Sequence, residues 1–260
     1  MKNTLFFTLF ILGSVCLVSL YFLYHYYTGP IQKQSYKFCN STNDTINIAY
    51  IGDSWAFLHK DHSCQIDKIL EDSLCLPFKI FSYGLSGLTS RDIYESIFEN
   101  EDFKQFLQKR NYKFCFISAG INDTNMKMDT SYYKKSMDYI IQIMLENHIR
   151  PIILEIPDYD IISTYYRYRL CKKLFLRFSS WITDSPIDCK QLFRETLDDL
   201  IIEKGYMDNV SIIRYRSWNK DKANDWNSLY KEDRMHLNAK GYAVLDSAIA
   251  IDIIRTINSN

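Results

Sequence analysis

The chain has 260 residues, of which 47% are hydrophobic and 24% are charged, an ordinary balance for a protein that builds a core. Lys and Arg together number 31, as do Asp and Glu, so no net charge draws the whole chain to nucleic acid. Only 8 glycines and 5 prolines are present, which excludes collagen-like and low-complexity proteins.

The first element is an apolar segment, because no Asp, Glu, Lys or Arg lies between Lys2 and Lys33. Leu5–Tyr24 is almost wholly apolar, and about 20 such residues let a helix cross a bilayer core. Aromatic side chains gather at its far end, as they do at a membrane–water interface. We expect residues 1–27 to be an uncleaved, single-pass membrane anchor. A cleaved signal peptide and a buried core helix are the alternatives.

A polar stretch over residues 28–45 is expected to be a stalk, and one α/β domain is expected over residues 46–260. Apolar runs predict strands at 46–51, 78–81, 112–118, 151–156 and 210–213, and helical spacing predicts helices at 65–74, 91–108, 131–147, 192–202 and 239–254. Strands that alternate with helices indicate a parallel sheet of about five strands, covered on both faces. Ligands of such sheets bind beyond the carboxyl ends of the strands.

Polar motifs follow the first three predicted strands and precede the last helix. They are Gly52-Asp53-Ser54, Ser82-Tyr83-Gly84-Leu85-Ser86-Gly87, Gly120-Ile121-Asn122-Asp123 and Asp233-Arg234-Met235-His236. A serine on a tight strand-to-helix turn exposes its Oγ, but a hydroxyl needs an adjacent base to act as a nucleophile. His236 is the candidate base, and Asp233, three residues earlier, can orient its imidazole.

Three groups are candidates for binding the oxyanion of a tetrahedral intermediate. These are the backbone NH of Ser54, the unobstructed backbone NH of Gly87 and the side-chain amide of Asn122. Together with Ser54, Asp233 and His236, they predict a serine mechanism of acyl transfer to water or to another acceptor.

With these residues, the chain resembles the GDSL/SGNH hydrolase superfamily from about Ile46 to its carboxyl terminus. The resemblance implies a flavodoxin-like three-layer α/β/α fold and ester hydrolysis or acyl transfer without a cofactor. Ser54 matches the family's nucleophile, Gly87 and Asn122 match its oxyanion residues, and Asp233 with His236 matches its carboxylate–histidine pair. Trp55 stands where the signature has leucine, and the asparagine that often precedes the second block is replaced around Ser82-Tyr83.

Residues 158–190 are longer than a strand-to-helix connection requires, which indicates an insertion. Within it, residues 165–177 carry five basic side chains and no acidic one, interleaved with aromatic and aliphatic residues. This pattern has two interpretations. One is a lid that contacts an anionic or glycan substrate or lies on a membrane surface, and the other is an amphipathic helix with a solvated basic face.

Four aromatic side chains are candidates for lining the substrate site, by stacking on sugar rings, or else for packing the loops around it. They are Trp55, Trp218, Trp226 and Tyr230. By contrast, the cluster of His59, Asp61, His62 and Cys64 is expected to be a solvated loop, and no spacing of Cys and His predicts a zinc site.

We therefore expect a membrane-anchored serine esterase that cleaves small, acetyl-type acyl esters, with an acylated small molecule or an envelope glycan as its substrate. An acyltransferase acting on polysaccharide, or a lysophospholipase or thioesterase, would use the same residues. A non-catalytic envelope protein that binds glycan belongs to a different class. The expected location is a bacterial envelope, with the domain outside the cytoplasm. The six cysteines outside the apolar segment leave the disulfide pairing open, and the sequence does not specify an oligomeric state.

Overall fold

The computed structural model describes residues 2–38, 45–62, 65–219 and 228–258. Five parallel strands form one sheet in the order β2-β1-β3-β4-β5. The strands are β1 (Ile46–Gly52), β2 (Phe78–Gly84), β3 (Tyr112–Ser118), β4 (Arg150–Leu154) and β5 (Ser211–Ile213). This is the strand order of flavodoxin-like folds, so the expected fold class is confirmed.

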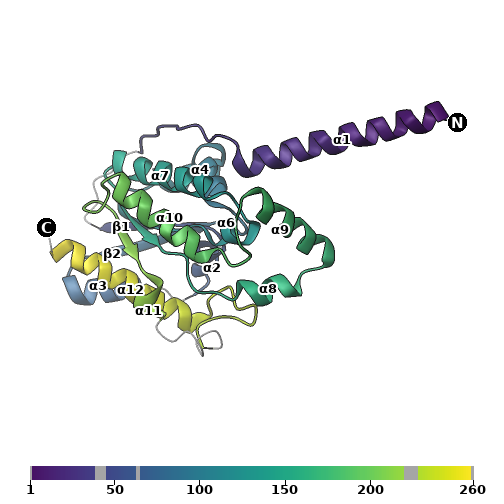
Figure 1. Ribbon diagram of the computed structural model, residues 1–260. Coiled ribbons are helices and arrows are strands. Elements are labelled where there is room, and N and C mark those ends of the chain that lie inside the picture. Colours follow the sequence, from purple (N-terminus) through teal and green to yellow (C-terminus); the bar gives the residue numbers. More distant parts are fainter. Residues whose placement is uncertain (1, 39–44, 63–64, 220–227, 259–260) are drawn as a thin grey trace.

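Helices cover both faces of the sheet (Figure 1). One layer holds α4 (Ser90–Glu99), α7 (Thr130–Glu146) and α10 (Lys190–Glu203), and the other holds α3 (Ile66–Leu74) and α12 (Ala239–Asn258). The remaining helices are α1 (Lys2–Thr28), α2 (Ser54–His59), α5 (Glu101–Gln108), α6 (Ile121–Met126), α8 (Ile161–Arg167), α9 (Leu170–Ile182) and α11 (Tyr215–Trp218). The central strands are buried on both faces, which explains why their sequences are continuous apolar runs.

The single helix that spacing predicts over residues 91–108 is wrong, because the structure divides it into α4 and α5. Asn100 has an extended backbone, and its side-chain oxygen accepts a hydrogen bond of 3.0 Å from the backbone NH of Phe103. Asparagine therefore ends one helix and caps the next, and the apolar spacing on either side does not reveal the break.

The apolar segment forms α1, which projects from the domain (Figure 1). Phe10, Leu17 and Phe22 are exposed to 64%, 69% and 66%, so α1 is not a core helix of this domain. Residues Phe10–Thr28 are long and apolar enough to cross a membrane, by the same criteria that a signal sequence meets.

The segment expected to be a stalk lies against the domain over residues 29–38. The backbone NH of Gln34 donates to the hydroxyl of Tyr94 at 2.7 Å, and the backbone NH of Phe38 donates to the Asn147 side chain at 2.6 Å. These bonds attach the connection to α4 and to the end of α7. The helix α1 is therefore joined to the domain by a docked segment.

Candidate active site

The carboxyl ends of three strands meet at one point of the sheet edge. Gly52, the last residue of β1, pairs with Gly84 of β2 on one side and with Ser118 of β3 on the other. A Cβ atom at Gly52 would lie 2.2 Å from the Ser118 carbonyl oxygen, and the φ angle of this residue is +155°. Only glycine fits, because β3 passes so close to this turn. The chain leaves β1 toward β2 on one side and reaches β3 on the other, so this edge is the topological switch point at which such sheets bind ligands.

Ser54 is the first residue of α2 and is 7% exposed. Asp53 caps this helix, since its side chain accepts a hydrogen bond of 3.0 Å from the backbone NH of Trp55. Burial raises the pKa of the Asp53 carboxyl to about 7, against the opposing effect of the Trp55 hydrogen bond. The turn thus places the Ser54 side chain and backbone NH at a helix amino terminus.

Ser54, His236 and Asp233 form a continuous hydrogen-bonded array. The Ser54 Oγ lies 2.9 Å from Nε2 of His236, and Nδ1 of the same ring lies 2.6 Å from Oδ2 of Asp233. A carboxylate accepts only, so Nδ1 donates to Asp233, and Nε2 is left free to accept the Ser54 proton. Ser54 and His236 are separated by 182 residues in the sequence.

The Asp233 carboxyl is held in its ionised form. Burial opposes ionisation, but hydrogen bonds from the backbone NH and the imidazole of His236 and from the backbone NH of Met235 lower the pKa of Asp233 below its usual value. An ionised Asp233 stabilises the imidazolium that forms when His236 takes up a proton.

A compact loop presents this pair. Tyr230 and Leu237 form an antiparallel bridge, and the backbone NH of Lys231 donates to the His236 carbonyl at 2.7 Å. Arg234 has a positive φ of +57° and forms an ion pair of 3.1 Å with the buried Asp160. The sequence did not indicate this ion pair, because 74 residues separate Asp160 from Arg234 and Asp160 lies outside the motifs.

The structure brings the Asn122 side chain to the loop that carries Gly87. Nδ2 of Asn122 donates to the Leu88 carbonyl oxygen at 2.9 Å, which leaves its second hydrogen available. Gly87 has a φ of +85°, and a Cβ atom there would meet nothing within 4 Å. The two proposed oxyanion donors therefore lie on neighbouring segments that follow β2 and β3.

Asp123 joins these two segments. Its carboxyl oxygens accept hydrogen bonds from the backbone NH of Ser90 at 2.8 Å and from its hydroxyl at 2.6 Å. Burial raises the pKa of Asp123 to about 6, although both Ser90 bonds lower it. The bonds hold the start of α4 against α6, and they thereby position Asn122.

Trp55, Trp218 and Tyr230, the candidates for lining the substrate site or for packing the loops around it, pack together in this structure. The three side chains are exposed to 0%, 5% and 3%, and the Trp55 ring lies in edge contact with Trp218 at 6.1 Å and with Tyr230 at 6.3 Å. Large aromatic rings gain more from packing together in the core than from exposure to water. The fourth candidate, Trp226, lies outside the described residues.

His59 is not part of a solvated loop but is buried at the end of α2, with 1% exposure. Its Nδ1 lies 2.8 Å from the Ser82 Oγ, and its Nε2 lies 2.8 Å from Oδ1 of Asp246 on α12. This second Ser–His–Asp array joins α2, β2 and α12. No sequence signal indicated it, because its residues are far apart in the chain.

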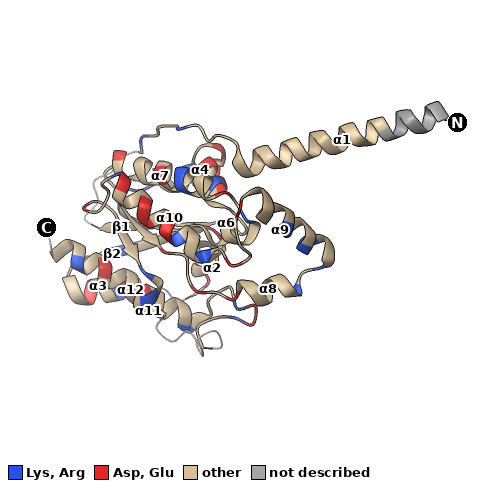
Figure 2. Ribbon diagram, in the orientation of Figure 1, with Lys and Arg blue, Asp and Glu red and all other residues tan. Residues whose placement is uncertain are grey.

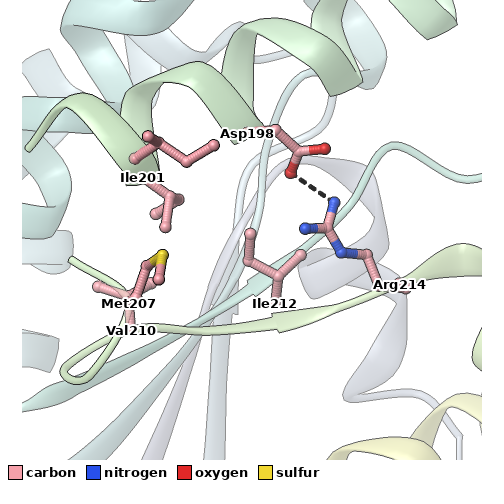
Figure 3. A pocket seen from close by; sticks show the side chains of 7 residues that line it. Asp198, Ile201, Met207, Val210, Ile212 and Arg214 are labelled. Atoms are coloured by element: carbon pink, nitrogen blue, oxygen red, sulfur yellow. Dashed lines mark ion pairs between the residues drawn. The ribbon is translucent and has the colours of Figure 1, made fainter. Parts of the chain in front are cut away.

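A pocket of about 430 Å³ lies elsewhere, beside the edge strand β5 (Figure 3). Its lining consists of Asp198, Ile201, Ile202, Met207, Val210, Ile212 and Arg214. Asp198 and Arg214 form an ion pair in it, and its other walls are apolar, so it holds no nucleophile with a base. Among the residues that the structure describes, no group of three or more His, Cys, Asp or Glu side chains is placed to hold a metal ion.

The domain resembles solved structures of acyl hydrolases. A lipase/acylhydrolase from Enterococcus faecalis superimposes with a TM-score of 0.54 and 14% identity, over 80% of this chain and 95% of that chain. A member of the lipolytic protein G-D-S-L family from Veillonella parvula gives 0.51 and 16% over 80% and 97%. A mutant of an acetyl-xylooligosaccharide esterase from Geobacillus Stearmophilus gives 0.53 and 14% over 80% and 94%.

No protein-family model and no curated protein sequence matches the chain. The likeness is thus one of three-dimensional structure, at identities where only the fold is preserved. It extends over most of each of these hydrolases. The chain therefore has the fold of the GDSL/SGNH hydrolases.

Proposed function

We propose that the protein is a serine ester hydrolase that acts through Ser54, His236 and Asp233. The observation that carries this proposal is the array in which Ser54 Oγ, the His236 ring and Asp233 are joined by contacts of 2.9 Å and 2.6 Å. It lies where the chain enters α2 from β1, at the edge where sheets of this topology bind their ligands. A protein that only bound a glycan would have no use for a base oriented in this way.

In the proposed reaction, His236 removes the Ser54 proton while Ser54 Oγ attacks the ester carbonyl carbon. The oxyanion that forms accepts hydrogen bonds from the backbone NH groups of Ser54 and Gly87 and from the Asn122 amide. His236 then protonates the leaving alcohol, and an acyl-enzyme remains on Ser54. Water, activated by the same imidazole, releases the acid and restores the serine.

We infer that the site takes a small acyl group. Trp55, the residue after the proposed nucleophile, packs with Trp218 and Tyr230 in the interior, and this packing supports a short acyl site. One of the solved structures with this fold is an acetyl-xylooligosaccharide esterase, which acts on an acetylated sugar chain. We propose an acetyl-type ester on a glycan of a bacterial envelope as the substrate.

The helix α1 supports a membrane location. Its side chains from Phe10 onward are mostly exposed and apolar, and residues Phe10–Thr28 could span a bilayer core. We propose a single-pass anchor with the domain outside the cytoplasm. Transfer of the acyl group to a sugar hydroxyl is the second candidate reaction, since hydrolysis and transfer differ only in how well the site excludes water.

Covalent labelling tests the serine mechanism. We expect a fluorophosphonate probe to label the full chain at Ser54, and the His236→Ala variant to lose this labelling because the base is absent. The matched control is His148→Ala, which removes a histidine at the end of α7 and should keep it. Equal labelling of wild type and His236→Ala, or labelling at another serine, would contradict the proposal.

Chain-length preference and acceptor identity then separate the candidate reactions. Faster turnover of p-nitrophenyl acetate than of the palmitate supports the small-acyl proposal, and the reverse order supports a lysophospholipase or thioesterase. Release of free acetate from an acetylated xylan supports hydrolysis, whereas the appearance of the acetyl group on an added oligosaccharide supports transfer.

A further inference from the structure

The helix α9 has an apolar stripe that faces away from the domain. Leu170, Leu174 and Trp181 are spaced so that they share one side of the helix, and they are exposed to 71%, 56% and 77%. The opposite side packs inward, since Leu176 and Ser179 are buried. A helix that exposes its large apolar side chains in this way needs a partner to cover them.

Lys173 and Arg177 flank this stripe on α9, and further basic side chains stand nearby in the sequence. Residues 165–177 of the α8–α9 segment include Arg167, Arg169, Lys172, Lys173 and Arg177 and no Asp or Glu. Figure 2 shows basic but no acidic residues along α9. An apolar helix face flanked by Lys and Arg is the pattern of helices that lie in the interface of an anionic membrane.

The helix α9 lies beside the point where α1 meets the domain. The Tyr27 ring at the end of α1 lies 6.3 Å from the Phe175 ring of α9. Tyr27 is buried in a cluster with Met128 and Tyr132, so this end of α1 is held firmly against the domain. Figure 1 shows α8 and α9 extending from the domain on the side from which α1 projects.

We propose that α8 and α9 form a second membrane contact, in which the stripe of Leu170, Leu174 and Trp181 enters the headgroup region of an anionic phospholipid bilayer. The Arg169 and Lys173 side chains of the segment lie against the lipid phosphates. This inference rests on the proposed anchoring by α1, because only a bilayer at the end of α1 comes within reach of α9. The positive charge of the segment complements anionic lipid, and α9 lies next to the proposed anchor. Both observations favour a lipid surface as the partner that covers the stripe.

The contact has a consequence for the proposed catalytic loop. Nη2 of Arg167, at the end of α8, donates to the Asp233 carbonyl oxygen at 3.1 Å, and Asp160, which caps α8, forms an ion pair with Arg234. The segment that meets the membrane is therefore bonded to the loop that holds Asp233 and His236. A bilayer bound at α9 sets the orientation of this loop relative to the membrane surface.

Tryptophan fluorescence of the full chain in lipid nanodiscs tests the proposal. The discs contain phosphatidylcholine and phosphatidylglycerol with bromine near the headgroup. We expect these lipids to quench the tryptophan emission through Trp181, which is exposed, whereas Trp55 and Trp218 are buried in the domain. Trp181→Phe should reduce the quenched fraction several-fold. Leu170→Glu with Leu174→Glu should do the same without releasing the chain from the disc, because α1 still anchors it. Discs of phosphatidylcholine alone should give weaker quenching.

The control is Ile202→Glu, which changes an exposed apolar side chain on α10 and should leave the quenching unchanged. Equal quenching in wild type and Trp181→Phe would overturn the proposal. Burial of Trp181 that depends on protein concentration and not on lipid would also overturn it, because the stripe would then bind a second copy of the chain. A chain that fails to enter the discs would refute the anchor and the inference together. A chain that enters but shows no Trp181 quenching refutes only the inference. Neither result depends on esterase activity.

Discussion

The Ser54–His236–Asp233 and Ser82–His59–Asp246 arrays contain the same three residue types at nearly the same distances, yet their surroundings differ. In the first, the His236 and Asp233 side chains are exposed to 25% and 47%, whereas those of His59 and Asp246 are exposed to 2% and 1%. The carboxylate binds Nδ1 in the first array and Nε2 in the second.

The backbone around each serine separates them further. Ser54 begins a helix directly after a strand ends, whereas Ser82 lies inside β2, paired with Tyr50. Only the first serine stands on a strand-to-helix turn, the setting proposed here for a nucleophile. Hydrogen-bond geometry alone therefore does not identify a catalytic triad. A strand-to-helix turn and oxyanion donors are needed as well, and an array whose histidine and carboxylate are buried joins elements of the fold.

Replacing each serine in turn is the strongest test of the difference between the two arrays. We expect Ser54→Ala to lower the turnover of p-nitrophenyl acetate by roughly 10⁴–10⁶-fold, because the nucleophile is lost. Ser82→Ala should leave turnover unchanged, and steady-state kinetics of the two purified variants measures both. A comparable loss in the two variants would make the arrays equivalent and refute the assignment.

The oxyanion donors provide the next test, since only the first array is proposed to have them. Asn122→Ala should lower kcat by about 10²–10³-fold, as the loss of one preorganised donor does. Asn122→Asp keeps the size of the side chain but removes its NH₂ group, and it should also be slow. Thermal melting is the control, because Asn122 also donates to Leu88. A slow variant whose Tm has fallen would point to a structural role of Asn122 instead.

Replacing Asp246 should mainly affect stability, and replacing Asp233 should mainly affect activity. We expect Asp246→Ala to lower the free energy of unfolding by about 3 kcal/mol, because it leaves Nε2 of His59 and the backbone NH of Gln65 without an acceptor in the interior. Asp233→Ala should cost less than about 1 kcal/mol, because its ion pair with His236 is partly solvated.

Urea denaturation of both variants measures this difference. The kinetic result should be reversed, with turnover reduced by about 10⁴-fold in Asp233→Ala. If Asp233→Ala proved the less stable variant, the assignment of a structural role to the buried array and a catalytic role to the exposed one would be wrong.

Much of the fold could be predicted from the sequence, because buried parallel strands are continuous apolar runs and their helices carry one apolar face. The third strand was predicted with its observed bounds, Tyr112–Ser118, and the other four strands within three residues. The break at Asn100 was not predicted, since one polar residue between two apolar faces fits either a continuous helix or a cap.

The roles of aromatic and charged side chains were harder to predict. Trp55, Trp218 and Tyr230 stand near the proposed catalytic motifs, which fits a lining role as well as a packing role, and the structure shows that all three are buried. His59 stands among polar residues in the sequence, yet it is buried against Asp246, 187 residues away. Contacts over such separations leave no local pattern.

The sequence by itself determined where the candidate residues stand, because Ser54, Gly87, Asn122, Asp233 and His236 lie in short motifs at predicted turns and strand ends, and it predicted their chemistry. Only the tertiary structure decided which side chains meet. It joined Ser54 to His236 across 182 residues, buried the histidine and the carboxylate of the second array, and placed α9 beside the end of α1. The physical reason is that turns and amphipathic faces are local properties of the chain, whereas burial and long-range pairing arise from how its layers pack.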